Sequence, residues 1–583
     1  MQISFKNGQI IADGYLHEDV PYDVSANGLS VCFDGKGGLS KYLSVRTGIE
    51  YSARSMTSFY KDGRRIGAYT NKRTSMAGRK QEICLSDDGF RIEMKQFITK
   101  DGNAVFVDMR FYSDTKTEFT LLYGTGTSWV VPAFACDGDW QWMDENYFFK
   151  VHVPVDGEKR LRFVVQYEGE PFVCEALLKS FDKYLHEAEA EIDGVIFPSS
   201  VKTEEEKALY MSALFCCIEN YKQYGGWEGF VAGCNYLDPL RTYYRDSYWT
   251  ILPMYAYDVT LIKRQILTLA KGIFEDGSCP SAVKTDFSGY WGGHYDSPCF
   301  FVMMAYDYVN HTGDQAFLQE KIGEKTIVEL CELVLKKQFE RTDETGLIYK
   351  EGPFNKLDWA DEVNRNGYVT YDEALFYRAV SCMEKLCRAV GKDGEAYRVK
   401  AEQIKTAINE ILWDEEKGYY VNYKDGAFTE DNLSVDTVLV YLFGIADETR
   451  ANRMLDAMEL LLETKNNSLQ KAGDYGIMCV YPFYKGIDSA YFKSSQDYEY
   501  HNGANWPYWS AIYAYAKYLA GRDYRYALES WFFYNLDRGI FTPIEYFSPC
   551  RKSGSTLQAW SGMSAFVYDR IGKESFFQAK TLK

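Results

Sequence analysis

The sequence of 583 residues predicts an N-terminal antiparallel β-sandwich followed by an (α/α)6 toroid. Three observations predict this order. Short segments rich in β-branched and aromatic residues, separated by turn signals, fill the chain up to about residue 190. After residue 200 the apolar residues recur with the period of a helix. No sequence repeat accompanies these helices, which argues against a plain helical solenoid.

Strands are expected in the first part of the chain at 91–98, 104–112 and 162–167. Apolar and polar residues alternate in several such segments, and the turn sequences DDG, KDG and VDGE separate them. Many short strands with regular turns are typical of an antiparallel sandwich. We therefore expect residues 1–176 to form a β-sandwich domain and the charged segment 177–202 to form a helical linker.

Residues 203–583 are expected to form an (α/α)6 domain. Short links such as residues 311–314 predict antiparallel pairs of helices, and longer links rich in Gly, Trp, Asp and Tyr join these pairs. Six such pairs with the long links gathered at one end describe a toroid. The predicted helices are 203–224, 243–256, 258–274, 294–311, 314–338, 372–390, 393–411, 433–443, 447–462, 505–520, 522–536 and 557–571.

The charge balance limits the kinds of partner. The chain has 65 Lys and Arg against 83 Asp and Glu, which gives a net charge of −18. A protein of this charge repels phosphate backbones and anionic lipids, so we expect neither nucleic acid nor a membrane as a partner. Aromatic residues make up 16% of the chain. Such an excess suits large cores between helices, and it also suits the stacking of sugar rings on aromatic faces.

The sequence indicates a cytoplasmic protein. Its N-terminus lacks a basic stretch followed by an apolar run, so no secretory signal is expected. No run of about 18 apolar residues suggests a transmembrane helix. The 14 cysteines are scattered without the spacing of a zinc site, which predicts reduced, mostly buried thiols. We expect no cofactor and no metal, with calcium held by loop carboxylates as the alternative.

Five links of the helical part concentrate carboxylates, aromatic rings and polar side chains just before a helix. They are residues 237–249, 289–301, 356–368, 499–509 and 539–549 followed by 556–562. Acetal hydrolysis needs two carboxyl groups that face each other, one to protonate the leaving group and one to activate water or attack carbon. The two groups need not be close in sequence. Links that converge on one pocket can supply them.

Two acidic residues are the candidates for this pair. Asp361 is the candidate acid, because a carboxyl held against an indole such as Trp359 in an apolar pocket has a raised pKa. Asp358 and Glu362 are its close competitors. Glu545 is the candidate base, since PIEYF places one carboxylate in an aromatic, uncharged run. Taken alone, Asp361 also fits a helix N-cap, and Glu545 also fits a surface salt bridge.

Other residues of these links are candidates for holding sugar hydroxyls. Asp246 can accept from two adjacent hydroxyl groups while Arg245 orients it, although the two also fit a structural ion pair. His501 can donate to a hydroxyl or be a buried structural residue. The aromatic candidates can stack on a sugar or only pack in the wall. The further candidates are Trp291, His294, Asp296, Trp359, Trp506 and Trp560.

At the level of motifs, residues 200–575 resemble the six-hairpin inverting glycosidases. The nearest patterns are the glucosidase modules of glycogen-debranching enzymes (amylo-α-1,6-glucosidase), with processing α-glucosidase I and trehalase as cousins. The segments that carry the resemblance, in family order, are YYRDSYW (243–249), YDSPCFF (295–301), LDWAD (357–361), YHNGANWP (500–507), GIFTPIEYF (539–547) and TLQAW (556–560). The chain departs from the family pattern at Asp358, an additional acid, and at Tyr244, which replaces a glycine.

The resemblance implies a glycoside hydrolase that removes a non-reducing terminal sugar, with α-linked glucose expected, from an oligosaccharide or glycoside. It implies that Asp361 is the general acid and Glu545 the base of an inverting reaction. It also implies sugar-binding roles for Asp296 and Gln558. Three alternatives stay open: an inverting disaccharide phosphorylase, an α-L-rhamnosidase-like exo-hydrolase, and a non-catalytic glycan-binding protein.

Overall fold

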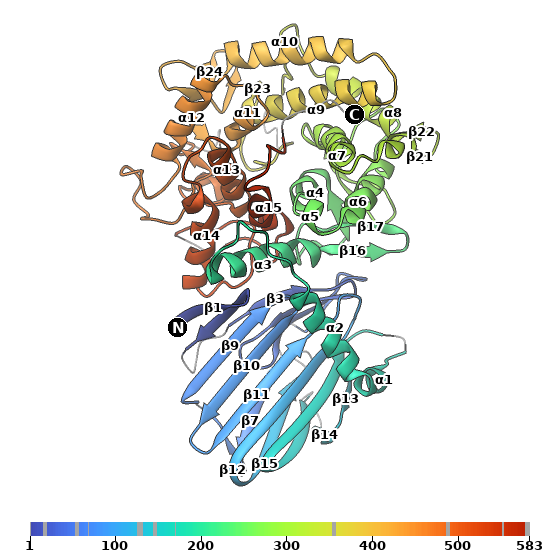
Figure 1. Ribbon diagram of the computed structural model, residues 1–583, viewed down its shortest axis with the longest axis vertical. Coiled ribbons are helices and arrows are strands. Elements are labelled where there is room, and N and C mark those ends of the chain that lie inside the picture. Colours follow the sequence, from blue (N-terminus) through green and yellow to red (C-terminus); the bar gives the residue numbers. More distant parts are fainter. Residues whose placement is uncertain are drawn as a thin grey trace.

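The computed structural model describes residues 2–14, 20–52, 57–67, 69–124, 132–143, 148–169, 171–351, 357–485, 490–550 and 553–577. An antiparallel β region comes first and a helical domain follows, in the order that the sequence predicts. Figure 1 shows the sheet as the lower layer and the helices as the upper one. The chain passes from one layer to the other through α2 (Phe181–Asp193) and α3 (Glu204–Ile218).

Within the described residues, eleven strands form one large antiparallel sheet. Its longest strands are β12 (Val105–Gly124) and β15 (Phe148–Gln166), and their pairing shifts in register between Ser113 and Thr117. The predicted strands are confirmed, since they lie in β11, β12 and β15. The other strands are β1 (Gln2–Lys6), β2 (Gln9–Asp13), β7 (Thr57–Lys61), β8 (Arg64–Arg65), β9 (Asn71–Ala77), β10 (Lys80–Asp87), β11 (Phe90–Phe97), β13 (Ala133–Cys136) and β14 (Asp139–Met143).

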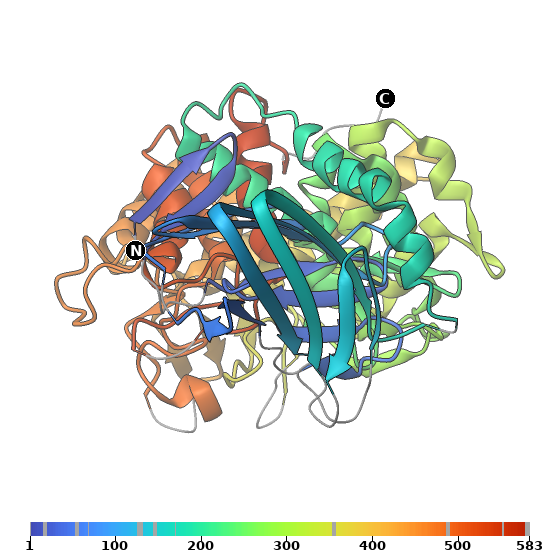
Figure 2. The same cartoon turned by 90° about the horizontal axis from the view of Figure 1, so that it is seen from below.

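A four-stranded sheet lies against the large one. The side-chain amides of Gln81 and Gln96 on the large sheet donate to the carbonyls of Val20 and Asp34 at 3.0 and 3.2 Å. Figure 2 shows the long strands from below, in front of the helical domain. The strands of the smaller sheet are β3 (Tyr22–Ser25), β4 (Leu29–Phe33), β5 (Leu39–Ser44) and β6 (Glu50–Ser52).

The helical domain has a helix in every segment where the sequence predicts one. Helices α7 and α13 are buried over most of their length, which places them inside the domain. The elements after α3 are α4 (Tyr244–Ile251), α5 (Met254–Tyr257), α6 (Val259–Lys271), α7 (Ser297–Thr312), η1 (Gln315–Gln319), α8 (Ile327–Phe339), α9 (Thr370–Ala389), α10 (Glu395–Ile411), η2 (Val435–Val438), α11 (Leu439–Leu442), α12 (Glu448–Leu461), η3 (Phe492–Ser495), α13 (Pro507–Leu519), α14 (Arg525–Asp537), η4 (Ala559–Gly562) and α15 (Met563–Arg570).

One predicted helix is divided in the structure. The sequence predicts a single helix over 314–338, whereas η1 ends at Gln319 and α8 begins at Ile327. Two short antiparallel strands turn the chain between them, and Gly323 in this turn has a φ of +61°. Thr326 then starts α8 with a capping box, because its side chain accepts from the backbone N–H of Glu329.

Buried polar contacts join the β region to the helical domain. The Lys222 ammonium, after α3, donates to the Ser25 hydroxyl at 2.8 Å and to the Ala26 carbonyl at 2.6 Å. The Ser25 N–H donates to the Glu219 carboxylate at 2.7 Å, and Arg79 of the large sheet donates to the Ser25 carbonyl at 2.8 Å. The end of β3 is therefore fixed to both the large sheet and the helical domain.

The described helices include none that is long and apolar enough to cross a lipid bilayer. The cysteines that the structure describes form no disulfide bonds, and most of their thiols are buried, with Cys550 exposed. The prediction of mostly buried, unpaired thiols is confirmed.

Candidate active site

Glu545 lies between α14 and η4, on a segment that pairs as a hairpin with residues 554–556. Its backbone N–H donates to the Ser555 carbonyl at 2.8 Å, and the Ser555 N–H donates back to the Glu545 carboxylate at 3.2 Å. A Cβ at Gly554 would lie 2.6 Å from the same carboxylate oxygen. The absence of a side chain at Gly554 therefore lets the hairpin close against Glu545.

The β region supports this hairpin from outside. The Asp23 N–H of β3 donates to the Thr542 hydroxyl at 3.2 Å. The Lys41 ammonium of β5 donates to the side-chain oxygen of Asn235, whose amide donates to the Ser555 hydroxyl at 3.0 Å. Strands of the smaller sheet thus reach both ends of the hairpin.

The surroundings of Glu545 give its carboxyl an unusual pKa. Burial raises this pKa to about 7, and the charges of Asp361 and Asp246 act in the same direction. A backbone N–H and the Lys493 ammonium act in the opposite direction. The Tyr236 hydroxyl donates to the carboxylate at 3.4 Å. A carboxyl with a pKa near 7 is suited to accept a proton at neutral pH.

Glu545 opens onto a cavity of about 500 Å³. Carboxylates, amides, hydroxyls and one ammonium line it together with aromatic rings and a glycine. This mixture suits a ligand with many hydroxyl groups and a partly apolar ring. Asp361 is not among the described residues of this wall. The lining residues are Asn235, Phe492, Lys493, Gln496, Glu499, Glu545, Tyr546, Ser553, Gly554 and Ser555.

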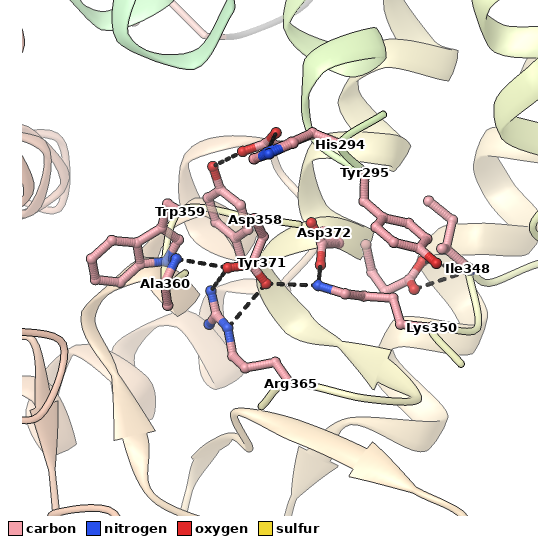
Figure 3. A network of polar contacts seen from close by, with 12 residues as sticks. His294, Tyr295, Ile348, Lys350, Asp358, Trp359, Ala360, Arg365, Tyr371 and Asp372 are labelled. Carbon is pink, nitrogen blue, oxygen red and sulfur yellow. Dashed lines mark hydrogen bonds and ion pairs between the residues drawn. The ribbon is translucent and has the colours of Figure 1, made fainter. Parts of the chain in front are cut away.

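A buried network of charges holds the segment that carries Asp361 (Figure 3). Asp358 accepts from Lys350 at 2.7 Å and from Arg365 at 3.1 and 3.2 Å. Lys350 also donates to Asp372 at 2.8 Å. Although burial works to raise the pKa of Asp358, the two cations hold it far below its usual value. Asp358 therefore stays ionised and cannot serve as the proton donor.

The same network fixes Trp359. Its indole N–H donates to Asp436 at 2.6 Å, and Arg365 donates to the same carboxylate oxygen at 2.6 Å. The Arg365 guanidinium also lies over the Trp359 ring, 5.7 Å from its centre. Trp359 thus forms a fixed wall of the site.

Asp361 has different surroundings from its acidic neighbours. Its side chain is 34% exposed, and its carboxylate lies 3.9 Å from Nδ1 of His501. The side chain of Asp358 is only 2% exposed. Glu362 accepts from the N–H and the hydroxyl of Ser494 at 3.1 and 3.4 Å. Asp358 and Glu362 therefore hold the chain in place, and Asp361 remains the candidate acid.

Aromatic rings surround His501. Its imidazole stacks on Trp506 with the ring centres 5.0 Å apart, and Trp359 meets it edge-on at 5.1 Å. Burial lowers the pKa of His501 well below its usual value, so the imidazole is neutral. Among the described residues, neither ring nitrogen of His501 has a hydrogen-bond partner, and the same holds for the Tyr508 hydroxyl and the Trp560 indole N–H. Such buried polar atoms indicate a site for water or a polar ligand.

Arg245 and His294 meet around the carboxylate of Asp296. Arg245 donates to Asp296 at 2.7 Å, and the Tyr371 hydroxyl donates to the same oxygen at 3.2 Å. His294 Nδ1 lies 3.6 Å from the other Asp296 oxygen. Next to Arg245, burial raises the pKa of Asp246 to about 6. Asp296 is therefore a shared partner of these side chains.

The charges of the acid and base candidates raise the pKa values of the same two tyrosines. Burial raises the pKa of Tyr500 well above its usual value, and the charges of Asp361 and Glu545 raise it further. Burial also raises the pKa of Tyr236, with further contributions from Glu545, Asp246 and Asp361. Two segments far apart in the sequence thus place their carboxylates near the same two tyrosines.

Two predicted site residues lie away from this centre. Trp291 is 57% exposed and meets the Tyr243 ring edge-on, 6.4 Å between ring centres, so it stands at the rim. Gln558 is buried behind the hairpin. Its N–H donates to the Pro543 carbonyl at 3.3 Å, and its side-chain oxygen would lie 2.6 Å from a Cβ at Gly233.

Sequence reasoning missed Lys493, Tyr236, Tyr500 and Arg365. Tyr500 belongs to the YHNGANWP motif and could have been found there. Tyr236 precedes the 237–249 link directly. Lys493 lies in an exposed segment with no motif, and the pairing of Arg365 with Asp358 depends on how the loop folds.

The described residues include no group of three His, Cys, Asp or Glu side chains that could hold a metal ion. Two acids of the site contact cations of the protein, since Asp296 contacts Arg245 and Asp358 contacts Lys350.

Two carboxylates beside a cavity lined by polar groups and aromatic rings fit the chemistry of glycoside hydrolysis. The family model described as amylo-alpha-1,6-glucosidase matches residues 250–565, more than half of the chain. The chain belongs to this family.

Three further proteins are similar to the chain. It is 25% identical over 254 residues to the solabiose phosphorylase of Paenibacillus borealis, a match that covers 40% of this chain and 32% of that protein. The match thus spans about a third of that relative's length. A bacterial glucoamylase solved with acarbose has the same fold, with a TM-score of 0.65 and 12% identity over 98% of this chain and 99% of that one. A GH78 rhamnosidase of Bacillus sp. GL1 gives a TM-score of 0.47 and 17% identity over 82% of this chain and 46% of that one.

Proposed function

We propose that the chain is an inverting exo-glycosidase that removes a terminal sugar, α-linked glucose in the first instance, from an oligosaccharide or glycoside. Asp361 protonates the glycosidic oxygen as the bond to the leaving group breaks. Glu545 takes a proton from the water that attacks the anomeric carbon from the opposite face. The sugar then leaves with its anomeric configuration inverted.

The observation that carries this proposal is the shared environment of Asp361 and Glu545. The charges of Asp361 and Glu545 both raise the pKa of Tyr500, and the charge of Asp361 also raises the pKa of Glu545. A base with a pKa of about 7 can take a proton from water and release it again at neutral pH. Membership of the amylo-alpha-1,6-glucosidase family supports the same reaction class.

Binding of the sugar is assigned to the buried polar atoms around Asp361. His501, Tyr508 and Trp560 each offer a polar atom to a hydroxyl group. Arg245 and Asp246 complete this side. A sugar that bonds to all of them would satisfy groups that are costly to leave unpaired.

The proposal includes the architecture expected from the sequence. Residues 1–176 would form a β-sandwich, residues 177–202 a helical linker, and residues 203–583 a catalytic (α/α)6 toroid. The full-length likeness to the glucoamylase fold supports this division. We also propose a cytoplasmic location.

The proposal is tested with the variants Asp361→Asn and Glu545→Gln. General acid or base catalysis contributes about 10²–10⁴-fold to a rate, so each variant should lose activity by this order while it stays folded. The measurement is hydrolysis of a panel of aryl glycosides and oligosaccharides, with the anomer of the first product followed by NMR.

Asp497→Asn is the matched control, because Asp497 is an exposed acid of the neighbouring loop. It should keep the activity of the natural protein. Near-normal rates in both amide variants on the true substrate, or a product with retained configuration, would rule out the assignment.

Phosphorolysis is the second candidate function, because the chain matches a solabiose phosphorylase and because Lys493 lines the cavity beside Glu545. In that reaction inorganic phosphate replaces water and the base is dispensable. Turnover that requires phosphate and survives Glu545→Gln would favour it. Turnover without phosphate would favour the hydrolase.

A further inference from the structure

A short helical turn carries Lys493 from the acid segment toward the base. This turn, η3, is bound to the residues that surround Asp361. The Tyr491 N–H donates to the Glu362 carbonyl at 3.1 Å, and its hydroxyl donates to the Asp361 carbonyl at 3.1 Å. The Ser494 N–H donates to the Glu362 carboxylate at 3.1 Å. The position of η3 is therefore fixed by the segment that holds the candidate acid.

The Lys493 side chain lies between this segment and the hairpin of Glu545. Its ammonium lies over the Tyr500 ring at 4.7 Å and over the Tyr546 ring at 5.8 Å. Both Lys493 and Glu545 line the 500 Å³ cavity. An ammonium held by two aromatic faces stays near the carboxylate without forming a direct ion pair that would block it.

The titratable side chains around Glu545 come from four segments. Tyr236 and Asp246 approach from the chain before and within α4, and Asp361 from the acid segment. Tyr546 is its neighbour on the hairpin. Three described side chains have the largest charge effects on the pKa of Glu545. Asp361 and Asp246 are acids and raise it, whereas Lys493 of η3 is the cation and lowers it.

We propose that Lys493 is a positioning residue that keeps the Glu545 carboxylate ionised between turnovers, opposing the nearby acids that favour its protonated form. This inference rests on the proposed function of Glu545 as the base. In this scheme, the segment of Asp361 holds η3 in place, and η3 places the positive charge of Lys493 near the base. Lys493 itself forms no bond with the reacting atoms in this scheme.

The test compares the pH dependence of kcat/KM for the natural protein, Lys493→Met and Lys493→Arg. A base must be ionised, so activity falls as the pH drops through its pKa. Without the ammonium, the acidic limb of the profile should move to higher pH by about half to one unit, since an exposed lysine is partly screened. Lys493→Arg keeps the positive charge and should restore the original acidic limb. If Lys493 were needed only for packing, the position of the limb would not depend on the charge at this residue.

Two further comparisons isolate the charge. High salt should narrow the difference between the acidic limbs of the natural protein and Lys493→Met, because it screens the ammonium that distinguishes them. Lys465→Met is the matched control, because Lys465 lies over a tyrosine ring, 3.9 Å from the centre of Tyr526, and is not among the residues that line the cavity. Its profile should match that of the natural protein.

A readout without turnover separates this inference from the proposed function. Coupling of Glu545 to a carbodiimide and an amine depends on the protonation of the carboxyl, and peptide mass spectrometry follows it at each pH. The midpoint of labelling should rise in Lys493→Met even if no glycoside is hydrolysed. An unchanged midpoint, or phosphate-dependent turnover that Lys493→Met abolishes, would overturn the role given to Lys493.

Discussion

Asp358 and Asp361 are three residues apart in one motif, yet their side chains have opposite surroundings. Asp358 is enclosed by Lys350 and Arg365, and its side chain is 2% exposed. Asp361 lies beside the neutral His501 and is 34% exposed. The sequence alone treats them as competitors for one role. The ion pairs of Asp358 indicate that it stabilises the loop. Asp361 is more exposed and lies beside a neutral imidazole, and it is therefore the candidate for catalysis.

Asp358→Asn is expected to destabilise the protein by about 3–5 kcal/mol, because it leaves two buried cations without their shared partner. Urea denaturation followed by fluorescence measures this loss. Asp361→Asn should change the free energy of unfolding by only about 0.5 kcal/mol, as expected of a part-exposed side chain. Equal stability of the two variants would contradict the division of roles.

The raised pKa of Glu545 predicts how stability changes with pH. Burial raises it from the ordinary value of 4.5 to about 7, so folding favours the neutral carboxyl. Stability from this group is complete below about pH 4.5 and is lost as the pH rises through 7. Glu545→Gln removes this loss. The variant should gain about 2 kcal/mol or less over the natural protein between pH 5 and pH 8, measured by thermal unfolding at both values.

At the scale of elements, the hairpin of Glu545 shows how a glycine and two backbone hydrogen bonds place a carboxylate. Gly554 has no room for a methyl group, since a Cβ would lie 2.6 Å both from the Glu545 carboxylate and from the Tyr546 ring. The carboxylate must keep its distance from the attacked carbon to within a fraction of an ångström. The geometry of the turn is therefore part of the chemistry.

Gly554→Ala is expected to lower kcat about tenfold or more, because the added methyl group displaces the Glu545 carboxylate. KM should change less than kcat, since the sugar-binding side chains lie on other loops. Gly67→Ala is the control, because nothing lies within 4 Å of a Cβ at that position. Unchanged kcat in Gly554→Ala would show that the hairpin adapts without moving its carboxylate.

Elements that repeat a strong pattern could be predicted, and those that depend on turns could not. The helical period of the chain gave correct positions for α6 and α10, which each bury one continuous stripe, and for α9, which is buried over most of its length. The turn at Gly323 interrupted a predicted helix, since the apolar residues on both sides fit a single period. Motif order predicted that Asp361 and Glu545 act on one sugar, which stays a prediction, whereas the lone Lys493 had no pattern to reveal it.

At the scale of the whole molecule, the two layers are joined by polar groups that are expensive to separate. Lys222 bonds to Ser25, Ala26 and the Glu219 carbonyl, the last at 2.5 Å, while Ser25 bonds to the Glu219 carboxylate. Breaking this contact would expose a lysine and a glutamate that have lost their partners. The layers are therefore expected to unfold together.

Lys222→Met is expected to lower the free energy of unfolding by about 2–4 kcal/mol, since three buried acceptors lose their donor. A single cooperative transition in urea should shift to lower concentration. Lys159→Met, on an exposed position of β15, should leave the transition in place. Two separate transitions in the natural protein would show that the layers are independent.

The bonds from Asp23 to Thr542 and from Lys41 through Asn235 to Ser555 place the first fifty residues behind the base hairpin. The contacts described around Asp361 are made by η3 and His501, on the helical side of the molecule. A full-length variant without these bonds, such as Thr542→Val combined with Asn235→Ala, would then lose alignment at one half of the reaction and keep most of the sugar pocket. Such a variant should behave as a lectin, retaining glycans on an affinity column while turning them over slowly.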